Sequence, residues 1–142
     1  MQQHFLLEKE KKKWNCALID MDACVGSSKF NMFEFSTKDR SPALGGILIT
    51  YMLNQPEFKK LFIARAEFLL KNNFSSENLK IHFYKFRKNF SPMVEEHFRR
   101  WNSVDGIIKY KKALNVIEKF CVNRPFHFKK NMYKYFNSNK NQ

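Results

Sequence analysis

The fold class of this 142-residue chain is decided by residues 56–70, PEFKKLFIARAEFLL. Apolar side chains recur there every three or four residues, which places them along one side of an α-helix. Additional apolar residues widen that stripe, so we predict a central helix that is covered on more than one side. Asn54-Gln55-Pro56 marks its start, because proline is well tolerated in the first turn of a helix. We expect Phe58, Phe62 and Phe68 in the core.

Similar start signals recur on both sides of this segment. Ser41-Pro42, Ser91-Pro92 and Arg124-Pro125 each place a proline where a helix can begin. In the stretch before Arg124, apolar residues recur at 3-4-3-4 spacing from Ile107 to Cys121, again the period of a helix. The predicted helices besides the central one cover residues 41–53, 75–89, 91–101, 103–121 and 124–136. At least four helices should therefore cover most of residues 41–136.

The N-terminal part has a different pattern. Residues 14–20, WNCALID, form a short apolar run with an acidic end, which predicts a buried strand. The charged run before it could be a turn from an earlier strand. Residues 23–40 show no sustained period and predict a loop, pinned to the core by the side chains of Phe30, Met32, Phe33 and Phe35. The chain is thus predicted to be a single, mostly α domain over 1–142 with a short N-terminal strand or hairpin.

The chain is strongly basic, with a formal net charge of +13. Residues 1–40 carry seven Lys or Arg and six Asp or Glu, whereas residues 41–142 carry nineteen and seven. Such a surface favours acidic or phosphate-bearing partners. A general bias of the composition towards lysine explains the charge equally well. No dense Lys/Arg block and no RNA-binding aromatic motif is present, which makes nucleic acid the weaker expectation.

Cysteine, histidine and hydropathy patterns exclude several classes of protein. The three cysteines form no CxxC pair, which is typical of a reduced, intracellular chain, and Cys121 is expected in the core. The four histidines form no zinc pattern. No apolar run reaches the roughly 20 residues that span a bilayer, and the N-terminus lacks a signal pattern. We therefore expect a cytoplasmic protein without a membrane partner.

A second cluster of interest lies at residues 97–101, HFRRW. Arg99 and Arg100 could hold a phosphate group. Alternatively, Trp101 is buried and the two arginines are solvated or pair with Glu95 or Glu96.

The acidic pair Asp20 and Asp22 is the one candidate for a chemical centre. The two residues stand at i and i+2 where the predicted strand ends, and side chains two apart on an extended backbone face the same way. Both carboxylates could then meet one hard cation such as Mg²⁺, which takes oxygen ligands and shares them with substrate phosphates. The pair would equally suit a solvated turn or a cap of the following loop.

The wider sequence resembles the CotH-type spore-coat kinase family over about residues 12–136. KWNCALIDMDACVG (13–26) is similar to the strand and metal-binding segment of that family. FSPMVEEHFRRW (90–101) is similar to its Pro…Glu…His…Arg-Trp helix. The remaining similarity lies in LITYMLNQPEFKKLFIARAEFLLKNNFSSENL (48–79) and SVDGIIKYKKALNVIEKFCVNRPFHFKKNM (103–132). The order and spacing of these segments carry the resemblance.

The resemblance implies the helical C-terminal lobe of an atypical kinase-like fold. The complete family uses ATP and Mg²⁺ to phosphorylate protein Ser or Thr, and Asp20 and Asp22 match its metal-binding element. Its nucleotide-binding lobe, ATP-contacting lysine and catalytic-base aspartate lie upstream of the matching segment, and residues 1–13 contain no glycine-rich loop. Ala23-Cys24-Val25 also replaces an aromatic residue that is often found there. The resemblance thus predicts a fragment, a split product or a degraded paralogue.

Two functions follow as hypotheses. The first is the C-terminal portion of a CotH-like protein kinase, inactive alone, with Mg²⁺ and ATP as implied cofactors and no catalytic residue of its own. The second is a non-catalytic basic helical module that binds an acidic protein or, less favoured, a nucleic acid.

Overall fold

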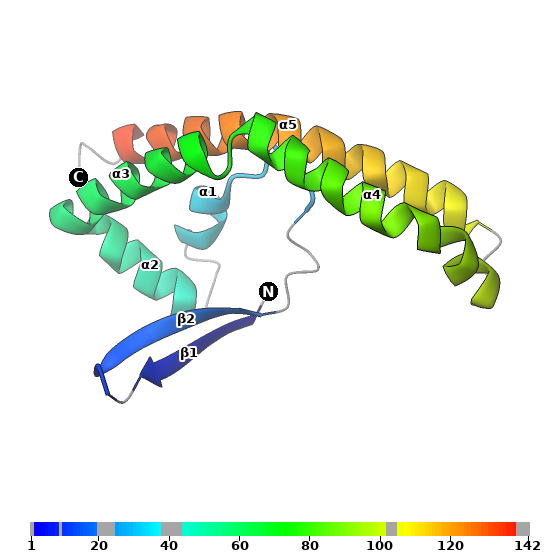
Figure 1. Cartoon of the computed structure of the whole chain (residues 1–142). Coiled ribbons are helices and arrows are strands. Elements are labelled where there is room, and N and C mark those ends of the chain that lie inside the picture. The colour runs from blue at the N-terminus through cyan, green and yellow to red at the C-terminus, as the bar shows by residue number, and fades with distance from the viewer. Residues whose placement is uncertain (1, 9, 20–24, 38–43, 102–104, 139–142) are drawn as a thin grey trace.

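The computed structural model describes residues 2–8, 10–19, 25–37, 44–101 and 105–138 of the chain. Figure 1 shows an elongated array of helices with a β-hairpin on one side. The elements follow in the order β1 (Gln2–Glu8), β2 (Lys13–Ile19), α1 (Met32–Thr37), α2 (Leu44–Asn54), α3 (Pro56–Asn72), α4 (Ser76–Arg100) and α5 (Gly106–Ser138). The mostly α fold class is confirmed, with four long helices in the described part of residues 41–138.

The two strands pair antiparallel, with Gln2 opposite Ile19 and Glu8 opposite Lys13. The predicted strand over residues 14–20 corresponds to β2. Residues 10–12 belong to the turn between the strands, and Lys12 has a positive φ of 52° there. This left-handed conformation is uncommon for a residue with a Cβ and is typical of tight turns.

Helix α5 is the longest element and contacts most of the others. Its 33 residues correspond to a length of about 50 Å. Helix α4 runs antiparallel along its N-terminal half, whereas α3 lies beside its C-terminal half (Figure 1). Hydrogen bonds tie the helices together, from Ser76 Oγ to the carbonyl of Val122 (2.7 Å) and from Tyr133 Oη to Glu67.

Two separate hydrophobic cores lie along α5. The first buries Phe33 of α1, Leu53 of α2, and Met132 and Phe136 of α5, with Phe58 and Phe62 of α3 packed against them. Most ring pairs there meet edge-on or tilted, as between Phe33 and Phe62 at 6.0 Å between centroids, whereas Phe33 and Tyr135 are stacked. Such arrangements are favoured because the ring edge is positive and its face is negative.

The second core lies between α4 and α5. It buries Phe83, Leu114 and Cys121, with Leu79, Tyr110 and Ile117 packed around them. This confirms the 3-4-3-4 pattern read from residues 107–121 and the prediction that Cys121 is in the core. At the end of this hairpin a Cβ on Gly106 would overlap the Phe98 ring, so the close approach of the helices needs glycine at that position.

Two predicted helix breaks are wrong. Residues 75–89 and 91–101 form one helix, α4, that continues through Pro92, and residues 103–121 and 124–136 fall mostly in one helix, α5, that continues through Pro125. A proline costs about 3 kcal/mol in a helix interior because it removes a hydrogen bond and clashes with the preceding turn. Packing on both sides of Pro125 offsets that cost, since the second core precedes Pro125 and the first core follows it.

The loop predicted over residues 23–40 contains helix α1. The side chain of Asn31 accepts a hydrogen bond from the backbone N–H of Glu34 (3.3 Å) and donates one to the Glu34 carboxylate (3.3 Å). The first of these bonds is the side-chain cap of a helix start, and Asn31-Met32-Phe33-Glu34 was its sequence signal. Phe33 is buried as expected, whereas Phe30 and Phe35 are exposed.

Helix starts elsewhere follow the prediction where they are described. Pro56 begins α3, and Ser75 caps α4 by accepting a hydrogen bond from the N–H of Asn78 (3.2 Å). The predicted start at Ser41-Pro42 lies outside the described residues. Phe68 was expected in the core, and burial of Trp101 was one of two alternatives. The two side chains are 52% and 69% exposed, since no element among the described residues covers them.

Truncation of the first core should cost far more than truncation at the surface. Met132 is completely buried, so Met132→Ala leaves a cavity, and we expect it to lower the free energy of unfolding by about 2–5 kcal/mol. Met93 is 53% exposed, and Met93→Ala should stay within about 0.5 kcal/mol of the wild type. Urea denaturation of both variants tests this, and equal losses would contradict the assignment of the core.

Candidate functional site

The acidic pair predicted from the sequence, Asp20 and Asp22, lies outside the described residues. Strand β2 ends at Ile19, directly before Asp20, and the description resumes at Val25. The metal-site hypothesis therefore stays a prediction. Among the described residues no group of three His, Cys, Asp or Glu side chains could hold a metal ion.

The segment that follows the acidic pair is anchored to α5 by Arg124. One guanidinium nitrogen, Nη1, donates to the backbone carbonyls of Ser28 (3.2 Å) and Phe30 (2.6 Å). Hydrogen bonds from a charged donor are roughly twice as strong as those between neutral groups. A contact between residues nearly a hundred positions apart thus fixes residues 28–30, which precede α1, against the middle of α5.

Aromatic rings enclose the same guanidinium. The Arg124 Cζ atom lies 5.9 Å from the centroid of the Phe120 ring and 5.8 Å from that of Phe128. These distances fall in the range where a cation is attracted to the face of an aromatic ring. Burial lowers the pKa of Arg124 from its usual value, because the charged form loses part of its hydration.

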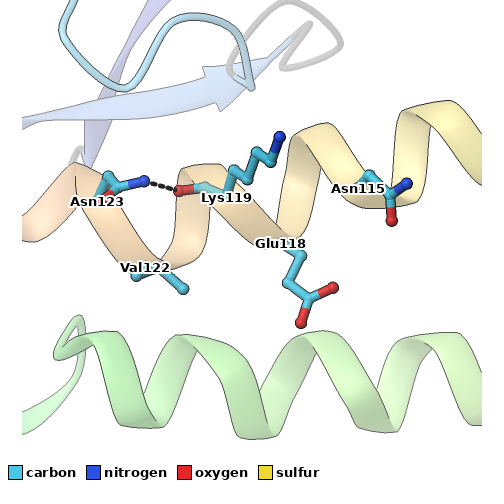
Figure 2. Close-up of a pocket in the computed structure, with 5 residues that line it drawn as sticks. All are labelled: Asn115, Glu118, Lys119, Val122 and Asn123. Carbon is cyan, nitrogen blue, oxygen red and sulfur yellow. Dashed lines mark hydrogen bonds between the residues drawn. The ribbon is translucent and has the colours of Figure 1, made fainter.

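A polar hollow of about 310 Å³ lies further along α5 (Figure 2). Figure 2 shows Glu118 pointing towards α4 and Lys119 pointing away from it. Its lining is formed by Asn115, Glu118, Lys119, Val122 and Asn123. Tyr84 Oη of α4 donates a hydrogen bond to Glu118 (2.6 Å), and that bond raises the pKa of Tyr84. The Glu118 carboxylate is thus already engaged in a hydrogen bond, and the lining of the hollow suits weak polar binding.

A second cavity is almost purely apolar and has a volume of about 430 Å³. It lies between α3 and α5, where α3 turns into α4. Eight of its eleven lining residues are aliphatic or aromatic, and a proline and two arginines complete it: Phe62, Arg65, Ala66, Leu69, Leu70, Phe74, Leu79, Phe120, Arg124, Pro125 and Phe128. We call it the α3–α5 groove.

Two further kinds of reactive or charged side chain were considered from the sequence, a cysteine thiol and an arginine pair. The Cys121 thiol is buried in the second core, and burial raises its pKa, which lowers the reactive thiolate fraction. Arg99 and Arg100 are exposed at the end of α4. Among the described helices, none combines the length and the apolar character needed to cross a membrane.

Sequence reasoning missed the role of Arg124. It treated Arg124-Pro125 only as a helix start, whereas the residue lies inside α5 and binds a distant loop. The signal that could have identified it is its position between Cys121 and Phe128, which both lie on packed sides of the helix. A charged residue at such a position usually has a specific partner.

Comparison with protein families gives one match. The model of the family described as CotH kinase protein matches residues 1–127 of the chain. The comparisons with curated proteins and with solved structures each found no match.

Loss of the Arg124 contacts should loosen the loop before α1. We expect Arg124→Met to remove both hydrogen bonds, to lower the free energy of unfolding by about 1–3 kcal/mol, and to speed amide hydrogen exchange in residues 25–31. Arg65→Met is the matched control, since the Arg65 side chain is exposed and stacks only on the Phe68 ring. Unchanged exchange in residues 25–31 of Arg124→Met would contradict the anchoring role.

Proposed function

This chain belongs to the CotH kinase family, and from that membership we propose that it is the C-terminal helical portion of a CotH-type protein kinase. In this proposal Asp20 and Asp22 bind Mg²⁺ together with the phosphates of ATP, in a domain that transfers a phosphoryl group to Ser or Thr of a protein. The observation that carries the proposal is the family match over residues 1–127, which includes both aspartates.

The donor chemistry of the acidic pair fits the metal. Mg²⁺ prefers carboxylate oxygens and keeps several waters, so one or two protein carboxylates plus substrate phosphates complete its shell. When bound, the ion would screen the negative charge of the phosphates. The neighbouring residues support such a role for the pair, because β2 leads directly into Asp20 and Arg124 holds the segment that begins at Val25.

The nucleotide-holding part of the active site is not assigned to this chain. Its four glycines stand at positions 26, 45, 46 and 106, and no glycine-rich phosphate loop occurs in the sequence. Phosphoryl transfer depends mainly on positioning ATP and on screening its charge. The chain by itself would then supply metal ligands and a helical scaffold, and the transfer itself would need further protein.

The first test of this proposal is an activity measurement. The purified chain, incubated with labelled ATP, Mg²⁺ and a general protein substrate, should show no transfer above a no-protein background. The physical reason is that a group cannot be transferred efficiently if its donor is not held in position. Robust transfer that Asp20→Ala abolishes would contradict the proposal that this chain needs further protein for phosphoryl transfer. The same result would support the metal site.

The second test asks whether the acidic pair binds metal. Two nearby carboxylates repel each other without a cation, so Asp22→Asn should leave the free protein as stable or slightly more stable. MgATP should raise the melting temperature of the wild type, since a ligand at ten times its dissociation constant stabilises by about 1.4 kcal/mol. We expect Asp20→Asn and Asp22→Asn to lose that shift.

The matched control is Asp105→Asn, which removes an exposed carboxylate 3.8 Å from the Lys109 ammonium. It should retain the full shift with MgATP. A destabilised Asp22→Asn, together with an identical shift in all four proteins, would show that the pair caps the loop and holds no metal.

A further inference from the structure

The α3–α5 groove exists because two cores meet there without filling the space between them. Phe62, Ala66 and Phe128 on one side pack against the first core, whereas Leu79 on the other side packs against the second. Phe74, in the turn between α3 and α4, forms part of the wall and is half exposed. A volume of about 430 Å³ lies in the range of ligand-binding clefts.

The groove holds positive charge without a matching carboxylate. Arg124 uses one nitrogen for two backbone carbonyls, and in the part of the chain that the structure describes neither Arg124 nor Arg65 forms an ion pair with an acidic side chain. The Arg124 guanidinium is half-buried, and a half-buried charge is stabilised by an opposite charge beside it. The exposed lining of the groove is almost entirely apolar, so the two arginines contribute to it mainly through their carbon atoms. The Arg65 side chain is exposed and stacks on the Phe68 ring, so an anion can reach its guanidinium from solvent.

Large apolar side chains lie exposed on the helices around the groove. Leu61 and Phe68 of α3 and Phe126 of α5 are each more than half exposed, in addition to Phe74 in the wall itself. Apolar surface of this kind marks a protein contact more than a small-molecule site, because a small ligand would leave it in water. Two parallel or antiparallel helix faces with a groove between them are the usual receptor for a third helix.

The positive net charge of the chain indicates which kind of partner would bind the groove. Residues 41–142 carry nineteen Lys or Arg and only seven Asp or Glu, so a second copy of the chain would bring like charges together. A segment rich in Asp and Glu would instead be attracted to this surface and would supply the missing counter-charge.

We propose that the α3–α5 groove binds an acidic amphipathic helix of a partner protein. Apolar side chains at positions i, i+3 or i+4, and i+7 of that helix fill the groove against Leu69, Leu70 and Phe74, and its carboxylates pair with Arg65 and Arg124. This binding site does not depend on the kinase function or on the acidic pair.

A panel of synthetic helical peptides tests the proposal against the full chain by fluorescence anisotropy. Each peptide carries Leu, Ile, Phe or Met at the groove-facing positions and Glu at the flanking ones, and a matched set carries Lys in place of Glu. We expect saturable binding by at least one acidic peptide, and binding by its lysine counterpart that is weaker by about tenfold or more. The affinity should fall as salt is added, since the charged contacts lie partly in solvent.

Two pairs of variants locate the binding site. Arg65→Glu should weaken the acidic peptide by about tenfold, whereas Lys60→Glu, an equal change of charge at an exposed position of α3 outside the groove, should have little effect. Phe74→Ser should weaken binding by a similar factor, and Phe90→Ser, at a phenylalanine of similar exposure on α4, should not. Both members of each pair alter exposed side chains, and thermal melts will confirm that they fold.

Several results would overturn the proposal. These are absence of binding across the whole panel, equal binding of acidic and basic peptides, and binding that Arg65→Glu and Phe74→Ser leave unchanged. Concentration-dependent dimerisation that Phe74→Ser abolishes would show that a second copy occupies the groove. Binding to phosphatidylglycerol vesicles that Arg65→Glu abolishes, with no peptide binding, would assign the groove to a lipid surface instead.

Discussion

The continuity of α5 through Pro125 is the constraint on which the rest of the structure depends. A break at this residue would separate the two cores, because Leu114 and Cys121 lie before it and Met132 and Phe136 after it. The missing N–H of the proline leaves a carbonyl of the preceding turn without its helical donor. Nearby, the Ser76 hydroxyl donates to the Val122 carbonyl and ties the start of α4 to this stretch of α5. The stability of two cores thus maintains a helix that its own sequence disfavours.

Several features of the molecule converge on the same stretch of α5. Arg124 directly precedes the proline and holds the loop between β2 and α1, while its guanidinium also lines the α3–α5 groove. The groove itself lies between the two cores, which leave a space unfilled there. Changes at the groove could therefore reach the segment after the acidic pair through one side chain.

Family membership and local geometry bear on different questions. The CotH match identifies the evolutionary relationship and gives the acidic pair its meaning as a proposed Mg²⁺ site. The hollow on α5 contains Glu118, whose carboxylate is already hydrogen-bonded to Tyr84. The α3–α5 groove is lined by apolar side chains and two arginines. The proposed metal ligands, Asp20 and Asp22, lie outside the described residues, whereas the described helices pack into two cores with a groove beside them.

The sequence by itself determined the mostly α fold class, the helix over residues 56–70, the Pro56 and Ser75 starts and the second core, because these follow from periodicity and capping within about twenty residues. The prediction that the helix over residues 56–70 is central and covered on more than one side was wrong, since α3 has no buried residue. It also identified the family through the order of its motifs. The proline signals predicted helix breaks at Pro92 and Pro125, and both helices continue there. The apolar pattern favoured burial of Phe68 and Trp101, and both side chains are exposed. Tertiary structure decided these points, since whether a proline interrupts a helix or an aromatic side chain is covered depends on elements far away in the chain. The role of Arg124 was beyond sequence reasoning for the same reason. Its partners are the backbone carbonyls of Ser28 and Phe30, nearly a hundred residues away, and every residue type has such a carbonyl, so no sequence pattern marks them.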